Sequence, residues 1–379
     1  MKIGILFPLS KAHPGVGFDF MDGLNGLLKH KGHTGNVTII KESVGYGANE
    51  KEVCQKAEKL LISDEVDILI AYVDEKVLPV LDPLVQATGR LMLVVNPGAN
   101  YPVNWIAQPT VVRLNLQHAF CCRLTGALAA QSGNGHAALA TSFYDCGYLH
   151  SAAMVKCFMD AGGVIRHNYI NNQAYDASFE INQLTGFLAA NPDCENLLCV
   201  FDALPASLFY ARLDEYKPDS PLHLFVSPMM LQALYPWSSE NTHDYSVEGY
   251  MPWHAGLENE ANRLLLQTVT RPATMFSLLG WETGLVLDDI MLHSGEATGN
   301  GEQIVAQLKQ HSISSPRGML TLDPETQIYT APLIKFSRKA GESFADTTQV
   351  TGLENEWRAF TAEPTEGAVT GWMNTYLCY

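Results

Sequence analysis

The chain has 379 residues, 47% of them hydrophobic, and a formal charge of −16. This length exceeds what one ordinary hydrophobic core supports, so we expect two domains. The acidic balance and the lack of any Lys/Arg run exclude a nucleic-acid surface, because phosphate contacts need clustered basic residues. No stretch reaches the roughly 18 unbroken apolar residues of a membrane-spanning helix, so we expect no membrane span.

Short apolar runs alternate with amphipathic stretches along the first third of the chain. Strands are expected at 2–9, 37–40, 66–72, 91–96 and 111–114, with helices at 17–31, 49–62 and 78–88. This alternation is typical of a parallel sheet that is buried on both faces and joined by right-handed crossovers. Open sheets of this kind bind ligands just beyond the carboxyl ends of their strands. Those ends fall at Leu9–Ser10, Tyr72–Asp74 and Asn96–Gly98.

The same pattern restarts in the second third. Strands are expected at 136–141, 164–168, 196–201 and 222–226, and helices at 117–131, 148–161, 179–190 and 205–216. Gly162-Gly163 and Asn191-Pro192-Asp193 supply turn signals between them. The sequence therefore predicts a second α/β unit of similar size.

Motifs of common enzymes are absent. A G-x-G-x-x-G loop does not follow the first strand, and Pro8 and Pro14 remove N–H groups that a pyrophosphate would use. There is no Walker A motif, G-x-S-x-G elbow or H-E-x-x-H pair. Cys146, Asp145 and His150 are close in sequence, but sequence adjacency is not triad geometry. We expect no enzymatic activity, no cofactor and no metal.

The eight cysteines include no C-x-x-C pair, which argues against a zinc site. Cys194 and Cys199 could form a disulfide in an oxidising compartment, although their spacing favours free buried thiols.

Six segments, taken in order, carry a resemblance to a known family. They are IGILFPLS (3–10), MDGLNGLLKHKG (21–32), the run 50–73, LMLVVNPGAN (91–100), SLLGWETGLVLDDIM (277–291) and SSPRGMLTLDPETQI (314–328). Together they resemble the type I periplasmic solute-binding proteins, in particular the receptors for branched-chain amino acids and amides. The resemblance implies two doubly wound Rossmann-like lobes joined by three hinge crossings.

The resemblance also implies the division of the chain. Lobe one would hold 1–116 plus 252–328, and lobe two 117–251 plus 329–379. Crossings are expected near 114–117, 249–254 and 322–331. Three linkers of this kind permit hinge closure over a small ligand. The tail after Lys339 is expected to pack on lobe two, with a partner-binding tail as the alternative.

By the same resemblance, lobe one would hold a carboxylate through backbone amides and hydroxyls, and an acid of lobe two would pair with an ammonium group. Asp202 is the preferred partner for an amine or amide N–H, although Asp74 and Asp202 could equally be helix N-caps. Two aromatic residues at a strand end and a linker are expected to line the cleft. The predicted ligand-binding residues are Ser10, Tyr72, Asp74, Gly98, Asn100, Tyr144, Asp202 and Trp253.

These expectations describe a receptor that captures a small polar, amino-acid-like or amide-like metabolite by hinge closure, with an ABC transporter permease as its membrane partner. Met1-Lys2 is expected to run directly into a core strand, which predicts no signal peptide in this sequence. The receptor would be periplasmic if a leader has been removed. If the native chain begins at Met1, the alternative is a cytoplasmic amide sensor of the same fold that regulates a partner protein.

Overall fold

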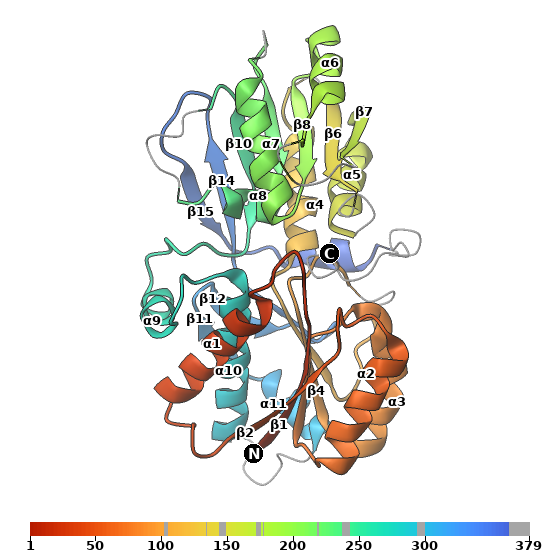
Figure 1. Ribbon diagram of the computed structural model, residues 1–379, viewed down its shortest axis with the longest axis vertical. Helices are drawn as coiled ribbons and strands as arrows, with labels where there is room; N and C mark the ends of the chain where they lie inside the picture. Colours follow the sequence, from red (N-terminus) through yellow and green to blue (C-terminus); the bar gives the residue numbers. More distant parts are fainter. Residues whose placement is uncertain are drawn as a thin grey trace. The chain divides into compact units, whose positions relative to one another are not determined.

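The computed structural model describes residues 1–101, 105–133, 135–143, 149–171, 176, 178–217, 220–236, 243–293 and 300–363. These residues form two compact units. Unit 1 contains Met1–Leu116 and Ala255–Ala331, and unit 2 contains Gln117–His254 and residues 332–363. The chain therefore passes between the units after Leu116, His254 and Ala331 (Figure 1). Among the described residues, no helix combines the length and apolar character needed to cross a membrane.

Unit 1 is built on an eight-stranded sheet in the order β11-β12-β13-β5-β4-β3-β1-β2. Strands β13, β5, β4, β3, β1 and β2 pair in parallel, while β11 and β12 add an antiparallel edge. The strands are β1 (Lys2–Phe7), β2 (Thr38–Ser43), β3 (Ile68–Ala71), β4 (Leu91–Asn96), β5 (Val111–Asn115), β11 (Ser312–Ser315), β12 (Gly318–Leu322) and β13 (Ile328–Thr330). Residues of β3, β4 and β5 are buried on both faces, as continuous apolar strands require.

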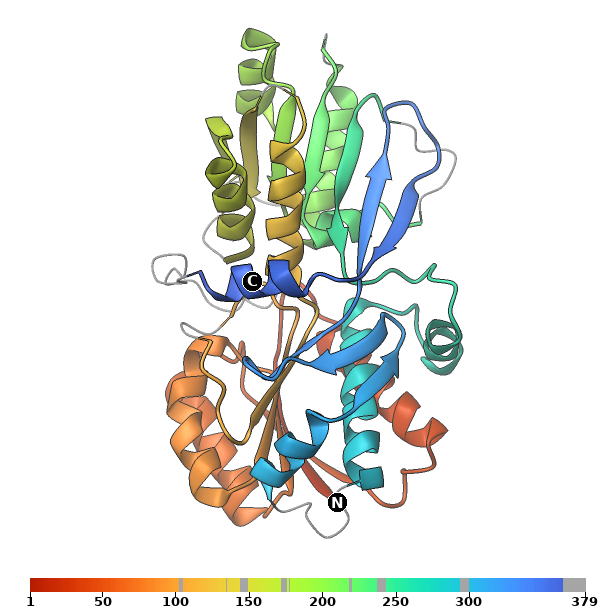
Figure 2. The same ribbon diagram turned by 180° about the vertical axis from the view of Figure 1, so that it is seen from behind.

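Helices cover both faces of this sheet. Figures 1 and 2 show α2 and α3 on one face and α1 and α10 on the other. The helices of unit 1 are α1 (Val16–His30), α2 (Glu50–Glu58), α3 (Leu78–Thr88), α9 (Glu260–Thr268), α10 (Met275–His293) and α11 (Gly301–Leu308), with a π-helical turn η1 (Lys59–Ser63) and a 3₁₀ turn η2 (Glu75–Val77).

Glycines allow α1 and α10 to pack closely. A Cβ added at Gly23 would lie 1.9 Å from the carbonyl oxygen of Ser277, and one at Gly280 would lie 1.9 Å from that of Phe20. Any larger residue at either position would force the helices apart. Helix α10, which follows the second crossing, is thereby fixed against the first helix of the chain.

Unit 2 contains a seven-stranded sheet in the order β15-β14-β10-β9-β8-β6-β7. Its parallel part is extended by β14 and β15, which pair antiparallel at one edge. The strands are β6 (His136–Ser142), β7 (Val164–Asn171), β8 (Asn196–Val200), β9 (His223–Val226), β10 (Ser246–Met251), β14 (Leu333–Arg338) and β15 (Asp346–Val350). The helices are α4 (His118–Ala130), α5 (Leu149–Asp160), α6 (Asn182–Ala190), α7 (Ala203–Glu215), α8 (Pro228–Ala233) and α12 (Glu354–Thr361). Helices α4 and α5 cover one face, and α7 and α8 the other.

The two parallel-dominated sheets confirm the predicted fold class of two doubly wound α/β units. Most predicted elements appear within a few residues of their expected bounds, and α3 and β4 match them. Helix α6 begins at Asn182, not at 179, and the helix predicted at 49–62 changes to a π-turn after Glu58. Strands β14 and β15 have no counterpart among the predicted elements.

The last described helix packs on unit 2. Trp357 and Phe360 of α12 are buried, and both rings contact Phe120 of α4, with centroid separations of 5.3 and 5.7 Å. Arg123 of α4 also forms an ion pair with Glu363. The tail therefore packs on this unit as far as residue 363, and residues 364–379 lie outside the described range.

Candidate functional site

Five of the predicted ligand-binding residues follow neighbouring strands of unit 1. Strands β4, β3 and β1 are adjacent and parallel, so their carboxyl ends share one edge of the sheet. Ser10 follows β1, Tyr72 and Asp74 follow β3, and Gly98 and Asn100 follow β4. Because open α/β sheets bind ligands at this edge, it is the candidate site of unit 1. We call it the unit 1 edge.

Tyr72 and Asp74 supply buried polar atoms without a partner at this edge. Tyr72 is fully buried and its ring packs edge-on against Phe20 at 5.6 Å, while its hydroxyl has no hydrogen-bond partner among the described residues. Asp74 is 2% exposed, and within the described part of the chain one of its carboxylate oxygens, Oδ2, also lacks a partner. Burial raises the pKa of both side chains, because it disfavours their charged forms. Unpaired buried polar atoms are costly, so each is suited to a ligand group.

The other oxygen of Asp74 caps the η2 turn. Its Oδ1 accepts a hydrogen bond from the backbone N–H of Lys76 at 3.0 Å. The backbone N–H of Asp74 donates to the carbonyl of Gly47 at 3.0 Å. Gly47 has φ +70°, and a Cβ there would lie 3.0 Å from the Cα of Val73. Capping and ligand contact are therefore compatible at Asp74, because each uses a different oxygen.

A buried network beneath the unit 1 edge joins its two loops. Glu75 and Arg113 form an ion pair of 3.3 Å, and Asn96 donates to the same Glu75 oxygen at 3.3 Å. The side-chain oxygen of Asn96 then accepts the backbone N–H of Gly98 at 2.7 Å. Burial raises the pKa of Glu75, while the charge of Arg113 opposes that rise. This network fixes the loop after β3 to the loop after β4.

Two of the residues at this edge have local roles. Gly98 has φ +76°, a left-handed conformation that glycine adopts without strain. Ser10 accepts the backbone N–H of His13 at 2.9 Å. His13 is half-buried and packs edge-on against Phe276 of α10, with ring centroids 5.0 Å apart.

Asp202 lies at the corresponding edge of unit 2. It comes two residues after the end of β8 and is 1% exposed. It occupies the N-cap position of α7, but its side chain makes no capping hydrogen bond there. The capping alternative is therefore wrong for Asp202. Ser142, the last residue of the neighbouring strand β6, and Ser227, directly after β9, are also buried and were not among the predicted residues.

The remaining two predicted residues are Trp253 and Tyr144. Trp253 is 3% exposed in the segment that follows β10. Tyr144 lies outside the described residues.

Cys194 and Cys199 are free and buried, so the disulfide alternative is wrong, and burial raises the pKa of both thiols.

Unit 2 contains a cavity of about 600 Å³, which lies away from the strand-end edge that holds Asp202. It is lined in part by Asp214, His243 and Tyr245, near the start of β10 and hence near the amino ends of the strands. The Asp214 carboxylate accepts from His243 at 2.5 Å and from Tyr245 at 2.8 Å. These contacts pair the polar groups with one another, and none of the predicted residues lines this cavity.

The fold and its strand-end residues define a binding protein with two α/β units. Sequence comparison then places the chain in the periplasmic binding protein family, whose model matches residues 1–336. No curated protein matches the sequence significantly.

Solved structures of ABC transporter solute-binding proteins share the fold. One, from R. palustris in complex with benzoate, is 19% identical, with 92% of this chain and 95% of that chain covered and a TM-score of 0.71. A substrate-binding protein from Sphaerobacter thermophilus is 16% identical, with 93% and 97% covered and a TM-score of 0.74. A branched-chain amino acid transporter substrate-binding protein from Streptococcus pneumoniae, in complex with isoleucine, is 13% identical, with 92% and 99% covered and a TM-score of 0.65.

Proposed function

We propose that this protein is a solute-binding receptor that captures a small polar metabolite, amino-acid-like or amide-like, and delivers it unchanged to an ABC transporter permease. Capture proceeds by hinge closure, and no chemistry is performed on the solute. Membership of the periplasmic binding protein family supports the receptor role and an extracytoplasmic location. Neither the family nor the solved neighbours support the cytoplasmic sensor alternative.

Two buried carboxylates carry the proposal for the ligand class. Among the described residues, Asp74 at the unit 1 edge has an oxygen without a partner. Asp202 is buried at the unit 2 edge, two residues after β8. Carboxylate oxygens accept hydrogen bonds from N–H groups, and a charge-assisted bond is roughly twice as strong as a neutral one. A solute with an amine or amide nitrogen would satisfy the open oxygen of Asp74 and compensate the cost of its burial.

A small aromatic carboxylate is the second candidate, because the R. palustris neighbour is a complex with benzoate. The unpartnered hydroxyl of Tyr72 could donate to a carboxylate. A protonated Asp74 could also donate, and burial raises the pKa of Asp74 in the direction that this requires. The Phe20 ring next to Tyr72 would contribute an aromatic wall.

Native mass spectrometry of freshly purified protein tests the receptor proposal directly, because a closed binding protein retains its cargo through purification. Calorimetric titration with isoleucine, a small aliphatic amide and benzoate then separates the two ligand classes. Compaction on ligand addition in small-angle X-ray scattering tests hinge closure. A protein that converts any of these compounds, or binds none of the three classes while carrying no cargo, would contradict the proposal.

The Tyr72→Phe variant tests the unit 1 edge itself. It removes one hydroxyl and keeps the ring. If that hydroxyl donates a hydrogen bond to the ligand, the binding free energy for the true solute should become less favourable by about 1–3 kcal/mol. Tyr329→Phe is the matched control, because Tyr329 is a second fully buried tyrosine of unit 1 whose hydroxyl has no partner in the described ranges. Equal affinities for the two variants would place the solute away from Tyr72.

A further inference from the structure

Two histidines and one aspartate converge at the far end of α10. Asp289 and His293 are four residues apart on this helix and so share one face. His311, in the short link between α11 and β11, joins them. The Nδ1 atom of His293 lies 3.2 Å from Asp289 Oδ1, and Nδ1 of His311 lies 3.4 Å from Asp289 Oδ2. One potential ligand atom from each residue lies within 4.8 Å of the others.

These separations suit a tetrahedral metal. Two ligand atoms at roughly 2.0–2.1 Å from a tetrahedral zinc ion are about 3.4 Å apart. The two N···O distances, 3.2 and 3.4 Å to different oxygens of the carboxylate, are close to this separation. A charge-assisted N–H···O bond is normally shorter, at about 2.7–2.9 Å. The two imidazole rings are tilted by 47°, with centroids 4.3 Å apart, and would splay slightly to direct one nitrogen each at a shared ion. Because one ligand atom of each residue already lies within 4.8 Å of the others, side-chain rotation is the adjustment that the site calls for.

The side chains are accessible enough to accept an ion. Asp289 is 12% exposed, His311 32% and His293 46%. His293 Nδ1 also lies 3.0 Å from the backbone carbonyl oxygen of Asp289, to which it can only donate, so Nδ1 must lose this proton and turn toward the metal before it can act as a ligand. A half-exposed ring can make that rotation. The neighbouring Asp288 is already paired, with Lys31 at 2.8 Å and His33 at 2.7 Å.

We propose that Asp289, His293 and His311 bind one divalent transition-metal ion, with zinc as the best fit, and leave its fourth position to water or an external ligand. Two imidazoles and one carboxylate favour zinc and its late first-row neighbours over Mg²⁺ and Ca²⁺, which take mainly oxygen ligands. The formal charge of −16 raises the local concentration of cations around the protein.

This site is distinct from the unit 1 edge. The first turn of α10 contacts the loop after β1 through Phe276 and His13. The last turns contact His33, just before β2, and therefore lie on the side of the amino ends of the strands. Phe276 and His293 are 17 positions apart on α10, which separates the two ends by about 25 Å. The proposed metal site is therefore independent of the solute and of the proposed function.

Competition titration with zinc and a chromophoric chelator tests the proposal on the full chain, with accessible thiols alkylated beforehand. We expect one zinc ion per chain. His293→Ala and His311→Ala should each weaken binding about tenfold or more, by loss of a ligand. His30→Ala is the matched control, because His30 is an exposed histidine at the end of α1 in the same unit, and it should bind zinc as the parent does.

A second measurement does not depend on variants. Zinc should protect His293 and His311 from carbethoxylation by diethyl pyrocarbonate, as mapped by mass spectrometry, and should leave His30 reactive. Unchanged zinc affinity in both histidine variants, or equal reactivity of the three histidines with and without zinc, would overturn the proposal. An absence of stoichiometric zinc binding by the parent would overturn it as well and would reduce the cluster to a histidine–aspartate ion pair.

Discussion

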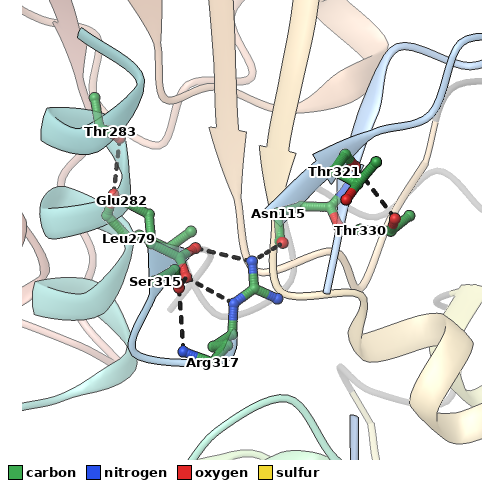
Figure 3. Close-up of polar contacts among 8 residues, drawn as sticks. All are labelled: Asn115, Leu279, Glu282, Thr283, Ser315, Arg317, Thr321 and Thr330. Carbon is green, nitrogen blue, oxygen red and sulfur yellow. Dashed lines mark hydrogen bonds and ion pairs between the residues drawn. The ribbon is translucent and has the colours of Figure 1, made fainter. Parts of the chain in front are cut away.

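Arg317 and Glu282 form a two-point ion pair in which both side chains are fully buried in unit 1. The guanidinium donates to the two carboxylate oxygens, at 2.8 Å each, and to the carbonyl of Asn115 at 3.1 Å (Figure 3). Ser315 donates its hydroxyl to the same carboxylate. The network joins α10 and the β11–β12 turn to the last residue of β5, one residue before the chain leaves unit 1.

Removing one charge of this pair should strongly destabilise the protein. We expect Glu282→Gln or Arg317→Met to lower the free energy of unfolding by about 3–5 kcal/mol, because the partner is left buried and uncompensated. The double variant should lose less free energy of unfolding than the two single variants lose together, because it leaves no unpaired buried charge. Denaturant unfolding followed by circular dichroism measures all three. Arg271→Met, at an exposed arginine of the same unit, is the control.

Asp202 should contribute to solute binding from unit 2. Once the cargo is identified, Asp202→Ala is expected to weaken its binding by about 2–5 kcal/mol, the usual cost of truncating one partner of a buried, hydrogen-bonded charge pair. Calorimetry measures this change. Asp244→Ala is the control, because Asp244 is an exposed aspartate of unit 2. If the Asp202 variant keeps the parent affinity, the residue does not contact the solute.

His254 should make stability depend on pH. Burial lowers its pKa to about 4 in the folded protein, below the ordinary value of 6.5. Between these values the unfolded chain binds a proton that the folded chain does not, so the free energy of unfolding falls as the pH drops. From about pH 7 to about pH 5 the loss from this residue should be about 1–2 kcal/mol. His254→Gln should show a smaller loss over that range, and an unchanged pH profile would reject this role.

Helix α12 should be a structural part of unit 2. Trp357→Ala is expected to lower the free energy of unfolding of this unit by about 3–5 kcal/mol, because it removes a large buried ring that packs on Phe120. Phe344→Ala is the matched control, since Phe344 is 77% exposed and its loss should cost little. Equal stability of the two variants would favour the alternative of a tail that binds a partner.

Local sequence patterns predicted most of the elements that build the two sheets. The apolar run 91–96 and the amphipathic run 78–88 became β4 and α3 within their expected bounds, because periodicity and turn residues act over a few positions. The π-turn at Lys59–Ser63 and the late start of α6 were not predicted. Strands β14 and β15 were missed because they extend the sheet of unit 2 from a distant part of the chain.

The candidate site likewise has features that the sequence predicted and features that only the structure shows. Sequence placed Ser10, Asp74, Gly98 and Asp202 after strands, since strand ends can be read from the alternation of apolar runs. It could not show that Asp74 caps a turn while Asp202 does not. That outcome depends on the geometry of each loop, including the close approach of Gly47 to Val73.

By itself, the sequence determined the alternation of strands and helices, the restart after residue 111 and the residues at the strand ends. Only the tertiary structure paired Arg317 with Glu282, and it alone brought His311 to Asp289 and His293. Such contacts join segments that are tens of residues apart. They depend on helix packing and strand order, which local periodicity does not specify.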